Sequence, residues 1–179
     1  TDAPSGVYRG TVQVKADGGL VETLPLTLTV RPFDLGPNPL ESSIYFHWGI
    51  TLDPAGALRI NSRSPAQYKA ELINLREHGV DNPTLSVRFD PGQLLQELKL
   101  RREAGMRNDR LYCLVINTWN PPDQLKQVIE LAKSFGYQEV YFYGIDEAQG
   151  DKLKGQRTQW EQVRALGGKV FVAGSIGHN

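Results

Sequence analysis

Two adjacent carboxylates, Asp146 and Glu147, follow the strand-like and aromatic run VYFYGI at 140–145. In parallel α/β folds ligands gather at the carboxyl ends of strands, so residues directly after such a run are the first candidates for chemistry. Carboxyl groups act as general acids and bases. The pair at Asp146 and Glu147 is therefore the sharpest candidate for chemistry in the sequence.

Other polar and aromatic residues lie at or just after the ends of the strand-like runs and are candidate substrate-binding residues. They are His47, Trp48, Asn117, Trp119, Tyr143 and His178. Aromatic rings beside carboxylates suit sugars, because the C–H face of a sugar stacks on a ring while its hydroxyls bond to polar groups. These residues therefore favour a carbohydrate site, with no cofactor and no metal.

Other interpretations of the same residues remain open. Asp146 could cap the following segment, with Glu147 in its first turn, because acidic residues favour helix N-termini. The pair could instead bind a divalent metal, although no companion histidine or carboxylate motif accompanies it. His47 and His178 could be hydrogen-bonded structural residues.

The elements that carry these residues differ between the two ends of the chain. Residues 7–15 and 23–31 alternate between apolar and polar side chains, which predicts two half-buried strands joined by the turn at 17–19. Two strands alone cannot bury an apolar face, so we expect 1–31 to be the C-terminal hairpin of a β-sandwich domain. The proline-rich segment that follows predicts a linker over 32–42.

From Ser43 onward, strand-like runs alternate with helix-like runs, a pattern typical of parallel βα units. The expected strands cover 44–48, 84–89, 111–116, 140–145 and 169–174. Three expected helices begin after the capping residues Ser64, Asp90 and Asn120, and the fourth carries Trp160. The expected helices end at Gly79, Gly105, Gly136 and Gly167.

Those glycines are spaced by about 30 residues, close to the roughly 31 residues that one unit of a (β/α)8 barrel occupies. We therefore predict an α/β fold in which 43–179 form the N-terminal half of a TIM barrel, with about five strands and four helices. An open flavodoxin-like sheet is the alternative, but it would need a phosphate-binding loop that 47–51 do not supply.

The strand ending in Asp146-Glu147, the helix-and-glycine units before it and the preceding hairpin together resemble glycoside hydrolase family 123 and its relatives. The resemblance covers most of the chain. It implies retaining, substrate-assisted hydrolysis of terminal β-linked N-acetylhexosaminides, with N-acetylgalactosaminides favoured. Glu147 would be the general acid/base, and Asp146 would orient the 2-acetamido group. The oxygen of that group then attacks the anomeric carbon and forms an oxazoline.

Composition limits the possible partners. Twenty Lys and Arg balance twenty Asp and Glu over 179 residues, so the basic surface of a nucleic-acid binder is not expected. The apolar runs are much shorter than the roughly 20 residues of a membrane helix, so no membrane partner is expected either. The expected partner is a carbohydrate.

A half barrel would leave sheet edges that the missing half or a partner chain must cover, and such a fragment could be inactive alone. No signal peptide is visible in the chain. An extracellular or periplasmic location follows only from the substrate class, because polymeric sugars are usually met outside the cytoplasm. The alternative function is a non-catalytic carbohydrate-binding protein of the same architecture.

Overall fold

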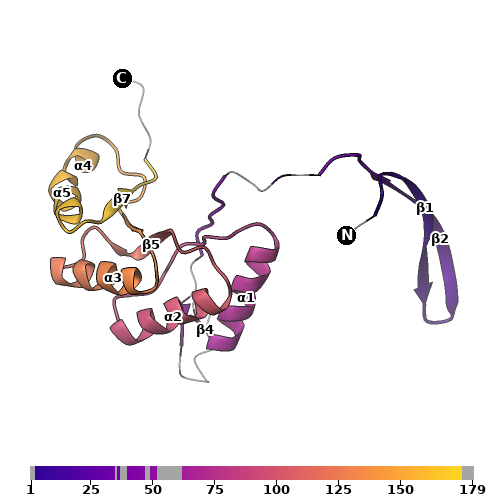
Figure 1. The fold of residues 1–179 in the computed structure, drawn as a ribbon, viewed down its shortest axis with the longest axis horizontal. Helices are drawn as coiled ribbons and strands as arrows, with labels where there is room; N and C mark the ends of the chain where they lie inside the picture. The colour runs from indigo at the N-terminus through magenta and orange to yellow at the C-terminus, as the bar shows by residue number, and fades with distance from the viewer. Residues whose placement is uncertain (1–2, 35, 37–39, 47–48, 52–61, 175–179) are drawn as a thin grey trace. The chain divides into compact units, whose positions relative to one another are not determined.

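The computed structural model describes residues 3–34, 36, 40–46, 49–51 and 62–174. The chain divides into two compact units, residues 1–39 and 40–179. The division falls inside the segment 32–42 that the sequence predicts as a linker. The two units are described separately below, with their elements drawn in Figure 1.

The first unit is an antiparallel hairpin of β1 (Gly6–Ala16) and β2 (Gly19–Val30) (Figure 1). Its register places Tyr8 opposite Leu28 and Val12 opposite Leu24, so the apolar side chains share one face, as the alternation predicts. These four side chains are exposed. The hairpin itself is confirmed, and its place in a β-sandwich stays a prediction.

The second unit mixes helices and strands, as predicted, and its described residues form no closed barrel. The helices are α1 (Pro65–Glu77), α2 (Pro91–Glu103), α3 (Pro122–Ser134), α4 (Gly150–Lys154) and α5 (Arg157–Ala165). The strands are β3 (Gly49–Ile50), β4 (Ser62–Arg63), β5 (Arg110–Asn117), β6 (Glu139–Tyr143) and β7 (Lys169–Phe171).

Local signals set most helix ends where the sequence predicts them. Ser64 and Asp90 cap α1 and α2, each accepting the backbone N–H three residues later, at 3.2 and 2.8 Å. The predicted cap at Asn120 is wrong, because its side-chain oxygen accepts from the Asn117 N–H at 2.9 Å and α3 has no side-chain cap. Left-handed glycines follow the helices at Gly79, Gly105, Gly136 and Gly167.

The strands β5, β6 and β7 form a parallel sheet in that order. Two earlier segments extend it: Leu85 bridges Cys113 of β5, and the Thr84 N–H donates to the Ile44 carbonyl at 3.0 Å. Neither 44–46, the described part of the predicted strand 44–48, nor the predicted strand 84–89 is a regular strand. One reason is that the Thr84 hydroxyl, and no backbone carbonyl, accepts from the Phe46 N–H at 2.9 Å.

The five segments 42–46, 82–85, β5, β6 and β7 therefore follow one another across the sheet in chain order. A flavodoxin-like sheet has the order 2-1-3-4-5, so that alternative is wrong. Chain order is what successive right-handed βα units produce when every helix lies on the same face of the sheet.

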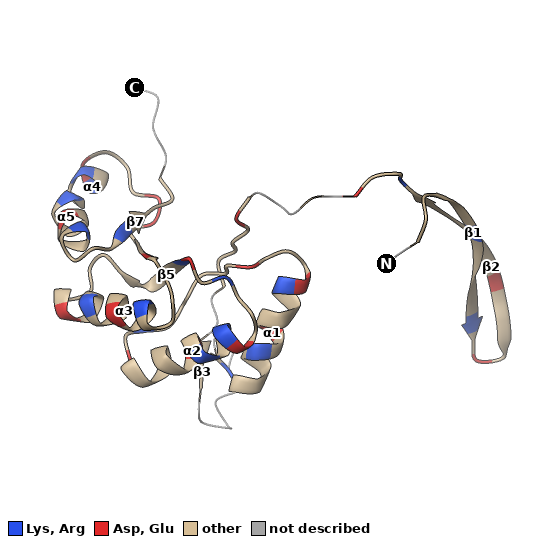
Figure 2. Ribbon diagram, in the orientation of Figure 1, with Lys and Arg blue, Asp and Glu red and all other residues tan. Residues whose placement is uncertain are grey.

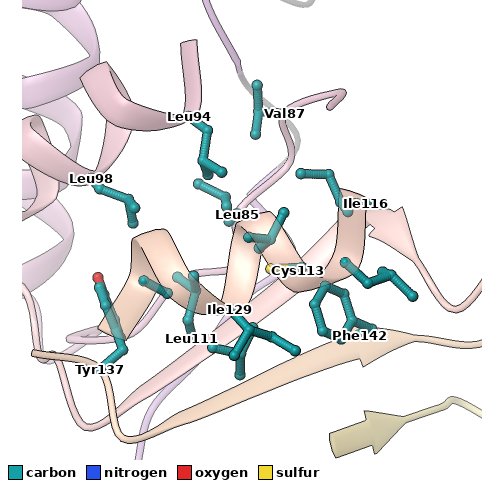
Figure 3. Packing of buried hydrophobic residues seen from close by; sticks show 14 of the residues in the cluster. Leu85, Val87, Leu94, Leu98, Leu111, Cys113, Ile116, Ile129, Tyr137 and Phe142 are labelled. Carbon is teal, nitrogen blue, oxygen red and sulfur yellow. The ribbon is translucent and has the colours of Figure 1, made fainter. Parts of the chain in front are cut away.

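Helices α2, α3 and α5 contribute residues to one core cluster with one face of this sheet, and Figure 3 shows the packing of α2 and α3 against it. Leu111 and Cys113 of β5 and Phe142 of β6 are fully buried there against leucines such as Leu94 and Leu98 of α2. Each buried leucine contributes about 1.5–3 kcal/mol, so this face holds the unit together. Burial also raises the pKa of the Cys113 thiol to about 12, consistent with a core residue and not a nucleophile.

The opposite face of the sheet is aromatic and concave. Tyr45, from the first segment, contacts Tyr143 of β6 edge to face, with ring centroids 5.9 Å apart. In a flat sheet these segments would lie three strand spacings apart, roughly 14 Å. Tyr45 and Phe171 of β7, the first and last segments, also line one cavity of about 240 Å³. The sheet therefore curves around this face.

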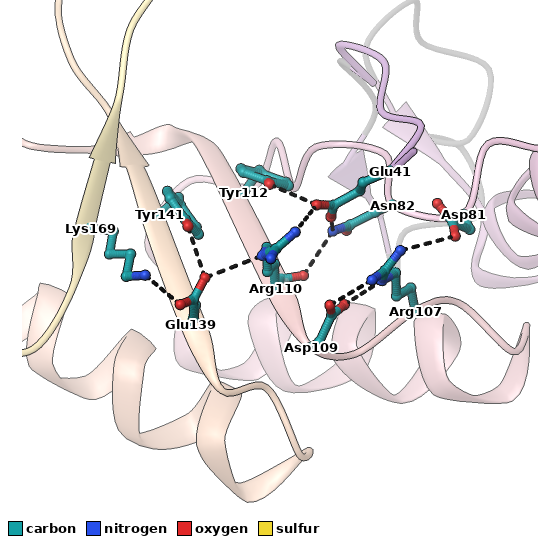
Figure 4. A network of polar contacts seen from close by, with 10 residues as sticks. All are labelled: Glu41, Asp81, Asn82, Arg107, Asp109, Arg110, Tyr112, Glu139, Tyr141 and Lys169. Atoms are coloured by element: carbon teal, nitrogen blue, oxygen red, sulfur yellow. Dashed lines mark hydrogen bonds and ion pairs between the residues drawn. The ribbon is translucent and has the colours of Figure 1, made fainter. Parts of the chain in front are cut away.

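A line of polar side chains joins all five segments at the amino-terminal edge of the sheet (Figure 4). Arg110 of β5 lies 2.6 Å from Glu41 and 3.2 Å from Glu139 of β6, and Glu139 also pairs with Lys169 of β7. Asn82 donates to Glu41 at 2.5 Å. Burial alone would raise the pKa of Glu41, but hydrogen bonds from Asn82 and Arg110 outweigh it and lower the pKa.

Charges of both signs are interspersed over helices α1, α2 and α3 (Figure 2). The sequence has no net charge, and these helices follow that balance. None of the described helices has the length and apolarity that a membrane crossing requires.

Candidate functional site

Asp146 and Glu147 lie in a turn just beyond β6, at the carboxyl edge of the sheet. β6 ends at Tyr143, two residues before the end of the predicted strand, because the Ile145 N–H donates to the side-chain oxygen of buried Gln156 at 2.6 Å. On the other side, the Glu147 N–H donates to the carbonyl of Ala173 at 2.9 Å. The turn is therefore attached both to the start of α5 and to the segment after β7.

Gly144 allows the chain to leave β6 in this direction. A β-carbon at Gly144 would lie 2.5 Å from Cγ1 of Val172 and 2.8 Å from Oε1 of Gln156. Distances this short are not tolerated, so only glycine fits between β6 and the turn. The position of the two carboxylates thus depends on a residue that has no side chain.

The Tyr143 hydroxyl is the centre of the polar contacts at this edge. It donates to Oδ1 of Asp146, and it accepts from the Tyr45 hydroxyl at 3.1 Å and from the Ala173 N–H at 3.4 Å. Burial, and then the bond to the Asp146 carboxylate, raises the pKa of Tyr143 far above its ordinary value. The hydroxyl therefore stays protonated and holds one oxygen of Asp146, a residue that is exposed.

Glu147 has a left-handed backbone, with φ of 49°. Among the described residues it is the one non-glycine residue with positive φ, a conformation that costs about 1–3 kcal/mol. Backbone strain of this kind is common at functional sites. Its side chain is exposed beside Asp146, so the turn presents two neighbouring carboxylates to solvent.

The structure decides between some of the alternatives for this pair. Helix α4 begins at Gly150 with Gln149 as its N-cap, so the interpretation of Asp146 and Glu147 as helix-capping residues is wrong. Within the part of the chain that the structure describes, no group of three or more His, Cys, Asp or Glu side chains could hold a metal ion.

Asn117 is the last residue of β5, and Trp119 lies in the turn that follows it. The Asn117 side-chain oxygen accepts the Trp119 N–H at 2.9 Å, so Asn117 shapes the turn more than it offers groups to a ligand. Trp119 is 52% exposed. The Thr118 N–H donates to the carbonyl of Tyr143 at 3.0 Å. This bond brings the Trp119 turn next to the end of β6.

The predicted binding residues thus fall into two groups. Tyr143, Asn117 and Trp119 lie with the carboxylates at one edge of the sheet. The other three, His47, Trp48 and His178, lie outside the described residues.

The sequence does not predict that two charged residues of α2, Glu97 and Arg101, are fully buried. Glu97 of α2 is fully buried and accepts from the Ile50 N–H at 3.1 Å and from the Tyr68 hydroxyl at 3.3 Å. Burial raises the pKa of Glu97 to about 7, although the Ile50 hydrogen bond and the charge of Arg101 oppose the rise. Glu97 and Arg101 are four residues apart on one helix, a spacing typical of surface ion pairs. No signal in the sequence therefore distinguishes them as buried.

Tyr45 and Gln156 also escape sequence-based prediction. Tyr45 lies within a predicted strand, and strand alternation could have placed it on the concave face. Gln156 stands beside a helix start where no periodic pattern applies, so nothing in the sequence indicates its bond to the turn.

Comparisons with protein-family models, with curated proteins and with solved structures found no match to this chain.

Proposed function

We propose that this chain belongs to a glycoside hydrolase that cleaves terminal β-linked N-acetylhexosaminides, with N-acetylgalactosaminides favoured. The observation that carries the proposal is the turn at Asp146 and Glu147. It presents two adjacent carboxylates at the carboxyl edge of a parallel sheet, and a protonated Tyr143 orients the first of them. Active sites of (β/α)8 enzymes lie at this edge.

The proposed architecture is the N-terminal half of a (β/α)8 barrel, preceded by the last hairpin of a β-sandwich. Three features support it: the chain order of the five segments, the helices packed on one face, and the curvature that brings Tyr45 against Tyr143. A closed barrel would place the aromatic face inside and the helices outside.

The proposed mechanism follows the family resemblance. The 2-acetamido oxygen bonds to the anomeric carbon as the glycosidic bond breaks, and Glu147 gives its proton to the leaving oxygen. Asp146 accepts the acetamido N–H and stabilises the oxazolinium ion. A water molecule then bonds to the anomeric carbon and gives a proton to Glu147 as the ring opens, so configuration is retained. Because the substrate's own acetamido oxygen is the nucleophile, the enzyme does not need a nucleophile on the opposite side of the sugar. One strand end can therefore supply both catalytic carboxylates.

The second candidate is a carbohydrate-binding protein of the same architecture without turnover. The exposed ring of Trp119 beside the carboxylate turn favours it, because a sugar can stack on this ring whether or not it is hydrolysed. In either case the expected partner is a carbohydrate met outside the cytoplasm.

The test uses the longest polypeptide that contains this chain and compares it with its Glu147→Gln and Asp146→Asn variants, with an aryl β-N-acetylgalactosaminide for turnover and N-acetylgalactosamine for binding. For an enzyme we expect Glu147→Gln to lower turnover by 10² or more while the affinity changes little. A chain that binds the sugar but never hydrolyses the aryl substrate would be the binding protein. A chain that does neither would contradict both candidates.

A further inference from the structure

A second concave site lies at the carboxyl edge of the sheet, beside the first three segments. It is a cavity of about 540 Å³ lined by Ile50, Ser86, Arg88, Gln93 and Val115, among others. This volume lies in the range of small-molecule sites in proteins. None of these residues belongs to the carboxylate turn.

The segment after Leu85 contributes most of the cavity wall. Leu85 and Val87 are buried in the cluster that packs against the helices, and Val87 also lines the cavity together with Ser86 and Arg88. Val115 of β5 lines it too and is 38% exposed. The cavity therefore combines a positive charge, a hydroxyl and an apolar wall.

Two polar side chains of the cavity, Ser86 and Arg88, lack protein partners of the kind expected for them within the described part of the chain. The Ser86 hydroxyl oxygen is buried and has no hydrogen-bond partner there, a state that costs about 1–3 kcal/mol unless something fills it. Arg88 takes part in none of the ion pairs found among those residues. The nearest acid in sequence, Asp90, instead accepts the N–H of Gln93 as the cap of α2.

We propose that this cavity binds an anionic substituent, a carboxylate or a sulfate, on a sugar that neighbours the cleaved hexosaminide. The inference rests on the proposed function and narrows its substrate class to acidic amino-sugar glycans. Arg88 pairs with the anion, as arginine does with planar or tetrahedral oxyanions. Ser86 and Gln93 supply further hydrogen bonds, and Val115 and Ile50 contact the apolar face of the sugar ring.

The test measures binding of methyl β-glucuronide, its uncharged methyl ester and N-acetylgalactosamine 4-sulfate to the full 179-residue chain. We expect at least one of the two anionic sugars to bind about tenfold more tightly than the ester. Arg88→Gln should remove that preference and Arg88→Lys should keep part of it. The matched control is Arg9→Gln, on the hairpin, which should change nothing. The tighter of the two anions identifies the substituent.

Equal binding of acid and ester, or no binding of any sugar, would overturn the proposal, as would an anion preference that survives in Arg88→Gln. The outcome is separable from the proposed function, because an aryl N-acetylgalactosaminide carries no anionic group. If the aryl substrate is hydrolysed but anionic sugars bind no more tightly than the uncharged ester, the anion subsite is wrong and the proposed enzyme activity stands. Anion preference of this chain, together with no hydrolysis by the longest polypeptide that contains it, would overturn the enzyme and leave the subsite.

Discussion

The two edges of the parallel sheet use their charged residues in opposite ways. At the amino-terminal edge, Glu41, Arg110, Glu139 and Lys169 bind one another in a continuous line. At the carboxyl edge, Arg88 has no ion pair and Asp146 bonds to an uncharged tyrosine, as far as the described residues show. Charges that satisfy each other stabilise a fold, whereas charges left without partners are available to a ligand.

This difference implies that substitutions at the two edges should separate stability from function. Glu97 and Gly144 support the carboxyl edge. Substitution of either residue should therefore change both the stability of the fold and the binding of sugar.

The largest effect is expected for Glu97, which supports Ile50 beside the anion cavity. Burial raises its pKa from an ordinary value of 4.5 to about 7 in the folded chain, so the folded state binds the proton more tightly than the unfolded state. The stabilising contribution is complete below pH 4.5 and is lost as the pH rises to 7, a loss of about 3 kcal/mol. Glu97→Gln should remove this loss.

Chemical denaturation of the parent chain and Glu97→Gln at several pH values between 4 and 8 provides the measurement. The free energies of unfolding should diverge as the pH rises, with Glu97→Gln the more stable at pH 8. Parallel pH profiles for the two chains would contradict the buried position of Glu97.

The next effect is expected for Gly144→Ala, which inserts a methyl group between β6 and the carboxylate turn. The added carbon meets Val172 and Gln156 at less than 3 Å, and overpacking of this kind costs about 1–3 kcal/mol. Denaturation should show the loss, and sugar binding should weaken because the turn moves. Gly10→Ala is the matched control, since a β-carbon there meets nothing within 4 Å.

A smaller effect is expected for Glu41→Ala at the amino-terminal edge. The change leaves Arg110, Tyr112 and Asn82 without their shared acceptor, which costs about 1–2 kcal/mol. Arg88→Ala at the carboxyl edge should stay within about 0.5 kcal/mol of the parent chain. Sugar binding should change only for Arg88→Ala. Denaturation and sugar titration test this. A larger loss of stability in Arg88→Ala than in Glu41→Ala, with a change of sugar binding only in Glu41→Ala, would contradict the distinction between the two edges.

The smallest effect, and of opposite sign, is expected for Glu147→Gly. Glycine adopts the left-handed backbone of this position without the cost of a side chain, so the chain should gain about 1 kcal/mol of stability. If Glu147 is the acid/base, the same change abolishes turnover. A melting curve shows the sign directly, and a destabilised Glu147→Gly chain would mean that no strain is stored there.

Local signals account for what the sequence could predict. The alternation in 7–15 and 23–31 predicts the hairpin, and the caps at Ser64 and Asp90 depend on residues only three positions apart. The pair at Asp146 and Glu147 is visible because it follows an aromatic run. Each of these features needs no knowledge of the tertiary structure.

The remainder depends on contacts that are distant in sequence. The burial of Glu97 and the contact of Tyr45 with Tyr143 arise only when helices and curved sheet are assembled. Ser86 and Arg88 alternate with Leu85 and Val87, so the pattern could have placed them on one face. Their significance comes from the cavity, which no spacing in the sequence indicates.

The most direct test of the central claim compares hydrolysis of an aryl β-N-acetylgalactosaminide with that of the matching 2-hydroxy galactoside, using the chain and any longer polypeptide that contains it. Substrate-assisted catalysis at Asp146 and Glu147 predicts cleavage of the acetamido substrate alone, and loss of that cleavage in Glu147→Gln. Equal cleavage of both substrates, or cleavage that survives in Glu147→Gln, would contradict the account.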